Sequence, residues 1–521
     1  MQNMCITKKN NIIVILIILT LFAAFILFYN LGDRMLWGDE AESALLGINI
    51  TKFGVPKATD GKNYITLLGM GRDTNDDNIW VWSPWLDEYI AAASFSLFGK
   101  TTASARWPFA FIALLSVILL AHTAHRIFRN KELTLFATLL YITNVAFILH
   151  ARQCRYYSLV CLAQVLLIFG FHRLLVKGSK SGIFCLVLAL TICFYCNYIL
   201  VLPGILAIII FTPVIYRRYP RLLRDLSICL VIFSLFVIPW LLYAQPFHQS
   251  ELVGFKNFVP KLYYYLLETN FHIVPVVLFL VPVIIHIMKR GKVPTKSQDT
   301  VVKDTKGFLW MLIIVHLLVL SVTPGAYFRY LIPLIPVFIL LLSAMIVDYF
   351  RVGFLRYLLV ITLSLSNVIP VLVLYPVRGK HTINMPIIQF LDEITSNYEN
   401  MLEDVVHFLR NNSSPNESIH VTDPEFPLIF YTDMRVVDIR LNPRLSMNDL
   451  PDWILAESAS GIPQLRELSV PVALKNYYKL IIIMVHDSPR GDSRPDPDAH
   501  VFFTSNRLKE FKIYKKRNRQ G

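Results

Sequence analysis

The sequence predicts a polytopic α-helical membrane protein with about eleven transmembrane helices and a C-terminal extracytoplasmic α/β domain. Of its 521 residues, 55% are hydrophobic and only 17% are charged, whereas soluble chains carry roughly 25% charged residues. The hydrophobic residues are gathered into runs of about 20, the length that spans a bilayer as a helix. Basic residues are concentrated in alternate connections between these runs, as in multi-pass membrane proteins. The composition excludes intrinsic disorder, which requires few hydrophobic and many charged residues.

The hydrophobic runs define eleven expected spans. The first run, about 11–30, follows Lys8 and Lys9 and has no small-residue cleavage site, so we expect a retained span and not a removed signal peptide. The other runs lie near 105–124, 132–150, 155–176, 181–197, 198–216, 225–244, 271–288, 307–323, 328–348 and 356–376.

Loop charge orients these spans. With the N-terminus in the cytoplasm, every inner connection is basic, and these connections are 125–131, 177–180, 216–224, 288–306 and 349–356. Because Lys and Arg favour the cytoplasmic side, we expect a cytoplasmic N-terminus and, after an odd number of spans, a C-terminal part on the outer side. The missing cleavage site, and the absence of any cysteine after Cys229 that could form an outer disulfide framework, are compatible with a plasma (inner) membrane.

The chain is expected to divide into a membrane module, 1–376, and an outer domain, 377–521. The first outer loop, 31–104, belongs to the membrane module and carries juxtamembrane helices. The outer domain begins with an amphipathic helical stretch, 386–412, and short strand-like runs separated by Pro-rich turns follow it. These runs are 418–423, 435–440, 477–485 and 511–516. The outer domain contains 18 Lys and Arg against 19 Asp and Glu, so the net charge of +14 lies in the membrane module and no nucleic-acid partner is expected.

Four arginines lie on the outer side, where the loop-charge rule disfavours them. Arg152 and Arg155 follow the third span in HARQCRYY, Arg329 precedes the tenth in GAYFRYLIP, and Arg106 begins the second in ARWPFAF. Ionisable groups at membrane depth are costly and usually face a cavity or a partner, and Arg binds phosphate through two parallel hydrogen bonds. These arginines, with the neighbouring Tyr330, are therefore candidates to bind a lipid phosphate or pyrophosphate. Snorkelling to lipid headgroups is the alternative interpretation.

Acidic residues gather in the first outer loop. Asp39 and Glu40 directly follow Trp37-Gly38, and Trp favours the membrane interface, so this pair is expected near the outer headgroup level. The apolar spacing after the pair predicts a short helix with Asp39 at or near its N-cap. The pair is either a helix cap or a catalytic or metal-binding group that faces a cavity. Asp87 and Glu88 are further candidates, for contact with an acceptor or for Mg²⁺ or Mn²⁺, which take carboxylate oxygens.

These residues resemble the GT-C glycosyltransferase superfamily, and most closely the branch that includes protein O-mannosyltransferases and the lipid A aminoarabinose transferase. An Asp-Glu pair that opens a long first outer loop, here Asp39-Glu40, is typical of this branch. Three longer segments are also similar to its motifs: WSPWLDEYIAAASFSLFGKTTASARWPFAF (82–111), ARQCRYYSL (151–159) and FRYLIPLIPVFILLL (328–342). Together, in this order, the motifs cover most of residues 31–345. The C-terminal domain matches only loosely, as an outer α/β cap.

The resemblance implies an enzyme that transfers a sugar from a polyprenyl-phosphate carrier to a lipid, glycan or protein acceptor on the outer face of the membrane. In such relatives the Asp of the Asp-Glu pair serves the acceptor as a base or positioning group, which maps onto Asp39 with Glu40 beside it. Relatives often carry Lys or His before a Pro-Pro in the juxtamembrane helix, where it meets the lipid phosphate. Here the stretch is Ser83-Pro84-Trp85, so Arg155 or Arg329 is expected to supply that contact.

The candidate residues fit the chemistry of such a transfer. A departing lipid phosphate needs its negative charge stabilised, which arginines can do, and the acceptor hydroxyl needs a carboxylate to take its proton. An oxocarbenium-like centre develops between the two, and we expect a single displacement with inversion.

Two other classes of protein are alternatives. A transporter or flippase of lipid-linked glycans would use the same arginines, but transporters commonly show inverted repeats and broken helices at the bilayer midplane. A membrane sensor gives no reason for the placement of Asp39, Glu40 and Arg155. Glycosyl transfer therefore explains more of the sequence than either alternative.

Overall fold

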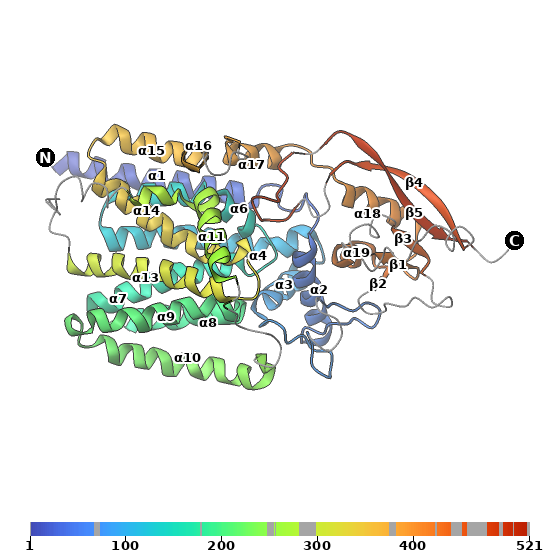
Figure 1. Cartoon of the computed structure of the whole chain (residues 1–521), viewed down its shortest axis with the longest axis horizontal. Helices are drawn as coiled ribbons and strands as arrows, with labels where there is room; N and C mark the ends of the chain where they lie inside the picture. Colours follow the sequence, from blue (N-terminus) through green and yellow to red (C-terminus); the bar gives the residue numbers. More distant parts are fainter. Residues whose placement is uncertain are drawn as a thin grey trace.

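The computed structural model describes most of the chain, and the molecule that it shows is elongated (Figure 1). The described residues are 2–66, 73–177, 180–246, 255, 257–280, 299–374, 382–421, 425–438, 451–455, 477–488, 493–503 and 505–517. Long helices run side by side at one end of the molecule, and a small sheet with its helices lies at the other. Helices α2 (Gly38–Phe53) and α3 (Leu86–Phe98) lie between these two parts.

The helical bundle forms from the apolar runs of the sequence. Such runs become helices because a helix satisfies its backbone hydrogen bonds internally, which the bilayer interior requires. The further helices of the bundle and its edge are α1 (Gln2–Phe28), α4 (Thr102–Phe128), α5 (Lys131–Ile142), α6 (Val145–Ala151), α7 (Tyr157–Lys177), α8 (Lys180–Cys196), α9 (Tyr198–Ile215), η1 (Tyr216–Arg218), α10 (Leu222–Ala244), α11 (Phe258–Glu268), η3 (Thr269–Ile273), η4 (Val276–Leu280), α13 (Thr300–Val322), η5 (Phe328–Leu334), α14 (Ile335–Tyr349), α15 (Gly353–Leu365), α16 (Val368–Leu374) and α17 (Pro386–Thr395).

The chain is a multi-pass membrane protein, as the composition predicted. Among the described residues, six helices are long and apolar enough to cross a membrane, and a seventh crossing results if the bent pair α5 and α6 is one span. The six are α4, α7, α9 with η1, α10, α13 and η5 with α14. Three shorter apolar helices, the second half of α1, α8 and α15, accompany them. The expected count of eleven continuous spans is not confirmed.

The third and the eleventh expected spans each contain a break that the hydrophobic pattern did not reveal. The third bends by 59° between α5 and α6, where Asn144 starts the second helix by accepting a hydrogen bond from the backbone N–H of Phe147. The eleventh is divided into α15 and α16 by residues 366–367. Its last residues, 375–376, lie outside the described part of the chain.

The expected eighth span, 271–288, is not an α-helix over its described residues. A π-helical turn ends at Ile273 and a 3-10 turn begins at Val276. Pro275 lies between them and cannot donate a backbone hydrogen bond, so the helix is interrupted there. Residues 281–288, and the first part of the expected inner connection 288–306, lie outside the described residues.

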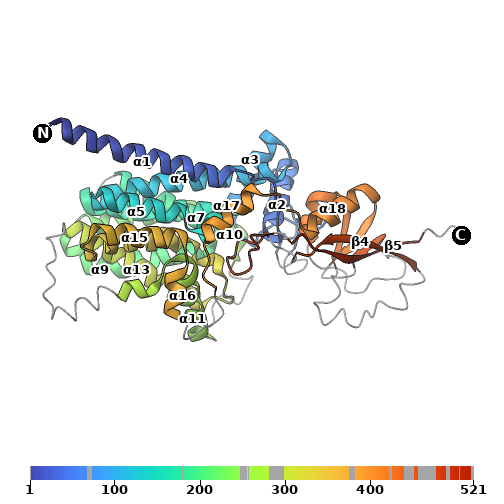
Figure 2. The same ribbon diagram turned by 90° about the horizontal axis from the view of Figure 1, so that it is seen from above.

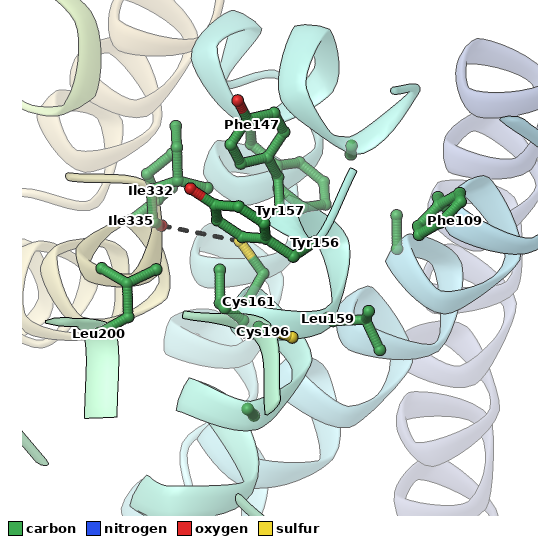
Figure 3. Packing of buried hydrophobic residues seen from close by; sticks show 14 of the residues in the cluster. Phe109, Phe147, Tyr156, Tyr157, Leu159, Cys161, Cys196, Leu200, Ile332 and Ile335 are labelled. Atoms are coloured by element: carbon green, nitrogen blue, oxygen red, sulfur yellow. Dashed lines mark hydrogen bonds between the residues drawn. The ribbon is translucent and has the colours of Figure 1, made fainter. Parts of the chain in front are cut away.

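Helix α7 packs at the centre of the bundle, and this packing positions the segments next to it. Cys161 is fully buried and its Sγ donates to the backbone oxygen of Ile332, 3.6 Å away, so α7 is joined to η5 (Figure 3). Farther along α7, Phe171 stacks on Phe308 of α13 with ring centroids 3.8 Å apart. The packing therefore brings the segment before α7, which carries Arg155, close to η5, which carries Arg329.

The described residues of the C-terminal part form a five-stranded mixed sheet in the order β2-β1-β3-β5-β4. Strand β1 pairs in parallel with β2 and β3, whereas β5 is antiparallel to β3 and β4. The elements of this part are α18 (Met401–Asn412), β1 (Ser418–Val421), α19 (Glu425–Thr432), β2 (Arg435–Asp438), β3 (Trp453–Leu455), β4 (Tyr478–His486) and β5 (Leu508–Lys516). Figure 2 shows the sheet beyond α2 and α3, away from the N-terminus.

The predicted amphipathic stretch 386–412 forms two helices and not one. Helix α17 ends at Thr395, and Asn400 starts α18 by accepting a hydrogen bond from the N–H of Glu403. Strands β1 and β2 lie within two of the strand-like runs of the sequence, whereas β4 ends one residue after its run and β5 begins three residues before its run. Strand β3 was not predicted because its three residues are too few to show an alternating pattern.

Candidate active site

Asp39 lies in the first turn of α2, at the end of the bundle that faces the sheet. The chain is extended at Trp37 (φ −84°, ψ 175°) and becomes helical at Gly38, which places Asp39 and Glu40 at the helix N-terminus. Carboxylates are favoured there because the helix dipole leaves partial positive charge on the unpaired N–H groups. Helix α2 lies so close to α3 that a Cβ at Gly47 would be 3.1 Å from the backbone oxygen of Glu88. This close contact fixes the position of α2 along α3.

Two arginines from distant parts of the chain meet at Asp39. Arg329 donates from Nη1 to Asp39 Oδ2 at 2.5 Å, and Arg155 Nη2 lies 3.7 Å from the same oxygen. The Asp39 and Arg329 side chains are each 23% exposed, and that of Arg155 is 12% exposed. The structure thus brings together a carboxylate and two guanidinium groups in a partly open site.

Aromatic rings hold both guanidinium groups in place. Arg329 lies over the Tyr327 ring, 4.5 Å from its centroid, and 5.8 Å from the Tyr330 centroid. Arg155 lies 5.7 Å from the Tyr156 centroid. Cations are attracted to aromatic faces, so the rings orient the arginines without neutralising them. The sequence-predicted Tyr330 therefore contacts Arg329 through its ring.

Glu40 and Arg106 form a separate, buried ion pair. Arg106 donates to both Glu40 carboxylate oxygens, at 2.8 and 2.7 Å, and also to the backbone oxygens of Leu31, Arg34 and Met35. Glu40 is fully buried and accepts in addition from the N–H of Cys154 at 2.8 Å. With these partners, Glu40 is held away from solvent and Arg106 fixes the loop before α2. This geometry favours positioning roles for both, in place of the catalytic and phosphate-binding roles expected from the sequence.

Arg152 also contacts the protein itself. Its guanidinium donates to the backbone oxygens of Ile26, Tyr29 and Asn30 at the end of α1. Cationic side chains satisfy the unpaired carbonyls of a helix C-terminus and interact favourably with its dipole. Arg152 thus acts as a cap for α1, and only two of the four predicted arginines reach Asp39.

Behind Asp39, three buried carboxyl groups share the neighbourhood of Arg155. Arg155 donates to Glu42 Oε1 at 3.1 Å and to Ser43 Oγ at 2.8 Å, and Ser43 Oγ donates to Asp87 Oδ2 at 3.2 Å. Burial raises the pKa of Glu42 to about 7, against the opposing effect of Arg155. Burial likewise raises the pKa of Asp87 and raises that of Glu88 well above its ordinary value. Asp87 and Glu88 are therefore buried carboxyl groups near Arg155, and they do not lie in an open loop.

A Glu42→Gln variant should be less sensitive to alkaline pH than the wild type. Because the folded-state pKa of Glu42 is raised from 4.5 to about 7, its contribution to stability is complete below pH 4.5 and is lost as the pH rises through 7. Glutamine does not ionise, so the fall in melting temperature between pH 5 and pH 8 should shrink. The exposed Glu510→Gln serves as the matched control, and an unchanged pH dependence in Glu42→Gln would contradict the assignment.

The described residues contain one group that could hold a metal ion. Glu268, His272 and Asp498 offer ligand atoms that all lie within 4.8 Å of one another. A histidine with two carboxylates suits a divalent transition metal better than Mg²⁺, which prefers oxygen ligands alone. Asp87 and Glu88, the pair for which the sequence left a Mg²⁺ or Mn²⁺ site open, do not belong to such a group among the described residues.

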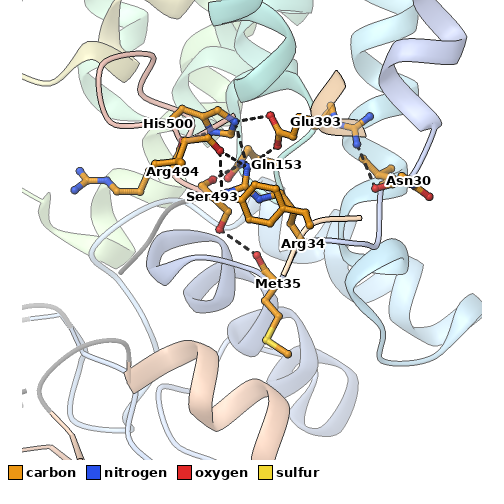
Figure 4. A network of polar contacts seen from close by, with 12 residues as sticks. Asn30, Arg34, Met35, Gln153, Glu393, Ser493, Arg494 and His500 are labelled. Atoms are coloured by element: carbon orange, nitrogen blue, oxygen red, sulfur yellow. Dashed lines mark hydrogen bonds and ion pairs between the residues drawn. The ribbon is translucent and has the colours of Figure 1, made fainter. Parts of the chain in front are cut away.

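A segment from the C-terminal part covers the loop before Asp39 (Figure 4). Glu393 of α17 accepts from Arg34 at 2.5 Å and lies 2.8 Å from His500 Nε2. Ser493 donates to the backbone oxygen of Met35 at 3.1 Å. These contacts attach residues 493–503 to the membrane module directly beside the site.

The attachment should weaken in acid. Although burial acts in the opposite direction, His500 and Arg34 hold the pKa of Glu393 below its ordinary value. A carboxyl with a depressed pKa stabilises the fold above its unfolded pKa and loses this effect as the pH falls. We expect Glu393→Gln to cost about 2 kcal/mol at pH 7, since hydrogen bonds to charged groups are worth about that much. The difference in melting temperature between wild type and Glu393→Gln should shrink below pH 4.5. An equal difference at pH 7 and below pH 4.5 would argue against this role of Glu393.

Sequence reasoning missed several residues of the site. Glu42 and Ser43 lie in the same motif as Asp39, but their contact with Arg155 depends on how α2 is rotated about its own axis. Asp496, which lies 3.9 Å from His150 Nε2, comes from a Pro-rich loop of the C-terminal part. The local pattern contains no signal for Asp496, because only the tertiary fold brings that loop to the site.

A family described as dolichyl-phosphate-mannose-protein mannosyltransferase matches residues 83–243, which is part of the chain. Solved structures share the fold of nearly the whole chain. Two of the solved structures that it resembles are of ArnT from Cupriavidus metallidurans. The one bound to undecaprenyl phosphate has a TM-score of 0.54 at 12% identity and covers 96% of this chain and 97% of that chain. The apo structure has a TM-score of 0.56 at 11% identity, with 97% and 98% covered.

No curated protein sequence matches the chain. At this level of identity the likeness to ArnT concerns the fold. It extends over nearly the whole length of both chains, so the C-terminal part is included.

Proposed function

We propose that this protein is a membrane glycosyltransferase that moves a sugar from a polyprenyl-phosphate carrier to a hydroxyl group of an acceptor on the outer face of the plasma (inner) membrane. The observation that carries this proposal is the convergence of Arg329 and Arg155 on Asp39, at one end of the helical bundle. The family description names dolichyl-phosphate-mannose, and one similar structure contains undecaprenyl phosphate. Both groups are polyprenyl phosphates, which supports a donor of this class.

The two arginines suit the leaving group of this reaction. The donor is a phosphodiester with one negative charge, and the released polyprenyl phosphate is a monoester that approaches two. Guanidinium groups placed where this charge develops stabilise the transition state more than the ground state. With the donor bound, its phosphate competes with Asp39 for Arg329 and Arg155. This competition frees the carboxylate.

Asp39 then acts on the acceptor. The acceptor oxygen attacks the anomeric carbon, the bond from that carbon to the phosphate oxygen breaks, and the hydroxyl proton passes to Asp39. One displacement of this kind inverts the anomeric configuration. NMR analysis of the product should find the configuration opposite to that of the donor, whereas net retention would exclude the single-displacement mechanism.

The proposal includes an orientation in the membrane. The basic connections favour a cytoplasmic N-terminus. The first crossing would then put Asp39 on the outer side, and eleven crossings, some of them broken, would put the C-terminal domain there as well. A domain boundary near residue 377 and the first loop 31–104 within the catalytic module belong to the same proposal. Its acceptor is a lipid, a glycan or a protein that is reached from this outer side.

The lipid that co-purifies with the protein tests the donor assignment. Mass spectrometry of gently solubilised wild type should find a polyprenyl phosphate. Arg329→Gln should lower its occupancy by about tenfold or more, because a charge-assisted hydrogen bond contributes roughly 1.5–3 kcal/mol. The exposed Arg351→Gln is the matched control. Phospholipid alone in the wild type, or equal occupancy in both variants, would contradict the assignment. A flippase would bind the same lipid but release no polyprenyl phosphate from the sugar-loaded form.

A further inference from the structure

A cavity lies beside the candidate active site. It has a volume of about 280 Å³ and is lined by residues of the α5–α6 junction, η3, α14, the break between α15 and α16, the start of α17 and the segment 497–502. Ligand clefts usually measure roughly 300–1,000 Å³. A cavity just below this range suits a single group of the size of one sugar.

The described residues that line the cavity are rich in amides and hydroxyls and include no Lys or Arg. Asn144, Asn270, Asn367, Asn384, Ser364 and Thr382 are among these polar residues. The one carboxylate, Asp498, is paired with His272 Nε2 at 2.9 Å. Phosphate binding relies on cationic donors, so this lining disfavours a phosphate and favours a neutral group with hydroxyls.

Two buried polar groups of the lining have no hydrogen-bond partner among the described residues. They are Asn270 Nδ2 and Ser364 Oγ, on residues that are only 5% and 6% exposed. Buried polar groups are almost always hydrogen-bonded, and an unsatisfied one is costly. Both residues line the cavity, and a side-chain rotation would present an amide donor and a hydroxyl there, which match the donor and acceptor pattern of a sugar ring. The Oδ1 atom of Asn270 is already used, because it accepts from the N–H of Val276 at 2.9 Å.

The cavity shares a wall with the candidate active site. His272 lines the cavity and packs edge-on against Phe328, with ring centroids 5.6 Å apart. Phe328 immediately precedes Arg329, whose guanidinium contacts Asp39. On the other side, Ile339 and Leu342 of α14 and Leu363 of α15 give the cavity an apolar floor. A molecule with a neutral polar head and an apolar part could therefore bind next to the reacting groups.

We infer that this cavity is the acceptor subsite and that it binds an uncharged, hydroxyl-bearing headgroup, such as a neutral sugar of a glycolipid. This inference rests on the glycosyl transfer proposed above. It specifies that the part of the acceptor bound in the cavity carries no phosphate. Asn270 Nδ2 and Ser364 Oγ form hydrogen bonds with the headgroup hydroxyls.

A binding measurement on the full-length protein in detergent tests the subsite. The probe is a monoglucosyl diacylglycerol, compared with a phosphatidic acid of the same acyl chains, and the readout is native mass spectrometry. The neutral glycolipid should bind more tightly. Ser364→Ala and Asn270→Asp, which keeps the oxygen that accepts from Val276, should each weaken its binding by about tenfold, the effect of losing a buried hydrogen bond. Ser343→Ala is the matched control, because Ser343 Oγ is also buried without a partner but lies outside the cavity.

Tighter binding of phosphatidic acid, or unchanged binding in both variants, would overturn the inference. The same preparations should contain co-purified polyprenyl phosphate at wild-type occupancy in both variants. If the wild type lacks that lipid, the proposed function fails, whichever glycolipid result is obtained. If the lipid is present but the neutral glycolipid does not bind, only the acceptor inference fails.

Discussion

An Asp39→Asn variant should lose sugar transfer by about 10²- to 10⁴-fold, the usual contribution of a positioned general base. The amide retains the size of the carboxylate but cannot take the acceptor proton. It also leaves Arg329 without its anionic partner and Arg155 with Glu42 alone, so binding of the donor phosphate should persist or strengthen. An assay of product formation with a labelled polyprenyl-phosphate sugar measures the loss, and lipid occupancy by mass spectrometry measures donor binding.

A neighbouring carboxylate provides the control for this variant. Asp33 lies in the same loop and is exposed, so Asp33→Asn should transfer sugar at close to the wild-type rate. If Asp39→Asn remains near wild type in rate, Asp39 has no part in proton transfer. If it loses transfer together with membrane insertion and donor binding, the variant has failed to fold, and the loss of transfer reflects misfolding and not a missing base.

The largest effect on stability should come from Arg106→Met. This change leaves the fully buried Glu40 carboxylate without its bidentate partner, and breaking a buried pair costs about 3–5 kcal/mol. The double variant Arg106→Met with Glu40→Gln should recover much of the loss, because no charge is stranded and the amide oxygen can still accept from the N–H of Cys154. Unfolding in detergent, followed by circular dichroism, measures both. A double variant no more stable than the single one would contradict the explanation by a stranded charge.

The prediction of Asp39, Arg155 and Arg329 as one site depended on topology. Their segments follow the first span, follow the third and precede the tenth, so they fall on the same side of the bundle under any orientation that keeps the span order. Their meeting at a single carboxylate oxygen then follows from the packing of α7 against η5. Span order is available from hydrophobic runs alone, which explains why this part of the site could be predicted.

The different roles of Asp39 and Glu40 could not be predicted in the same way. Successive residues of a helix differ by about 100° in direction, so adjacent carboxylates face different neighbours. The choice between them depends on how α2 is rotated against α4, where Arg106 lies. That rotation is set by tertiary packing, including the close approach at Gly47.

The hydrophobic pattern also did not predict the breaks within the spans. Asn144 and Pro275 interrupt apolar runs whose average composition still predicts a helix. Both residues lie at the cavity beside the active site. Irregular backbone at membrane depth is tolerated where it lines a cavity or is buried in protein. These breaks are therefore compatible with the fold, and their position at the cavity indicates a functional role.

A structure with bound donor lipid tests the central claim most directly. Cryo-electron microscopy of the full chain in a lipid nanodisc with undecaprenyl phosphate should place the phosphate within hydrogen-bonding distance of the Arg329 and Arg155 guanidinium groups, with Asp39 released from Arg329 and facing the phosphate. A phosphate bound elsewhere, with Arg329 still closed on Asp39, would contradict the account.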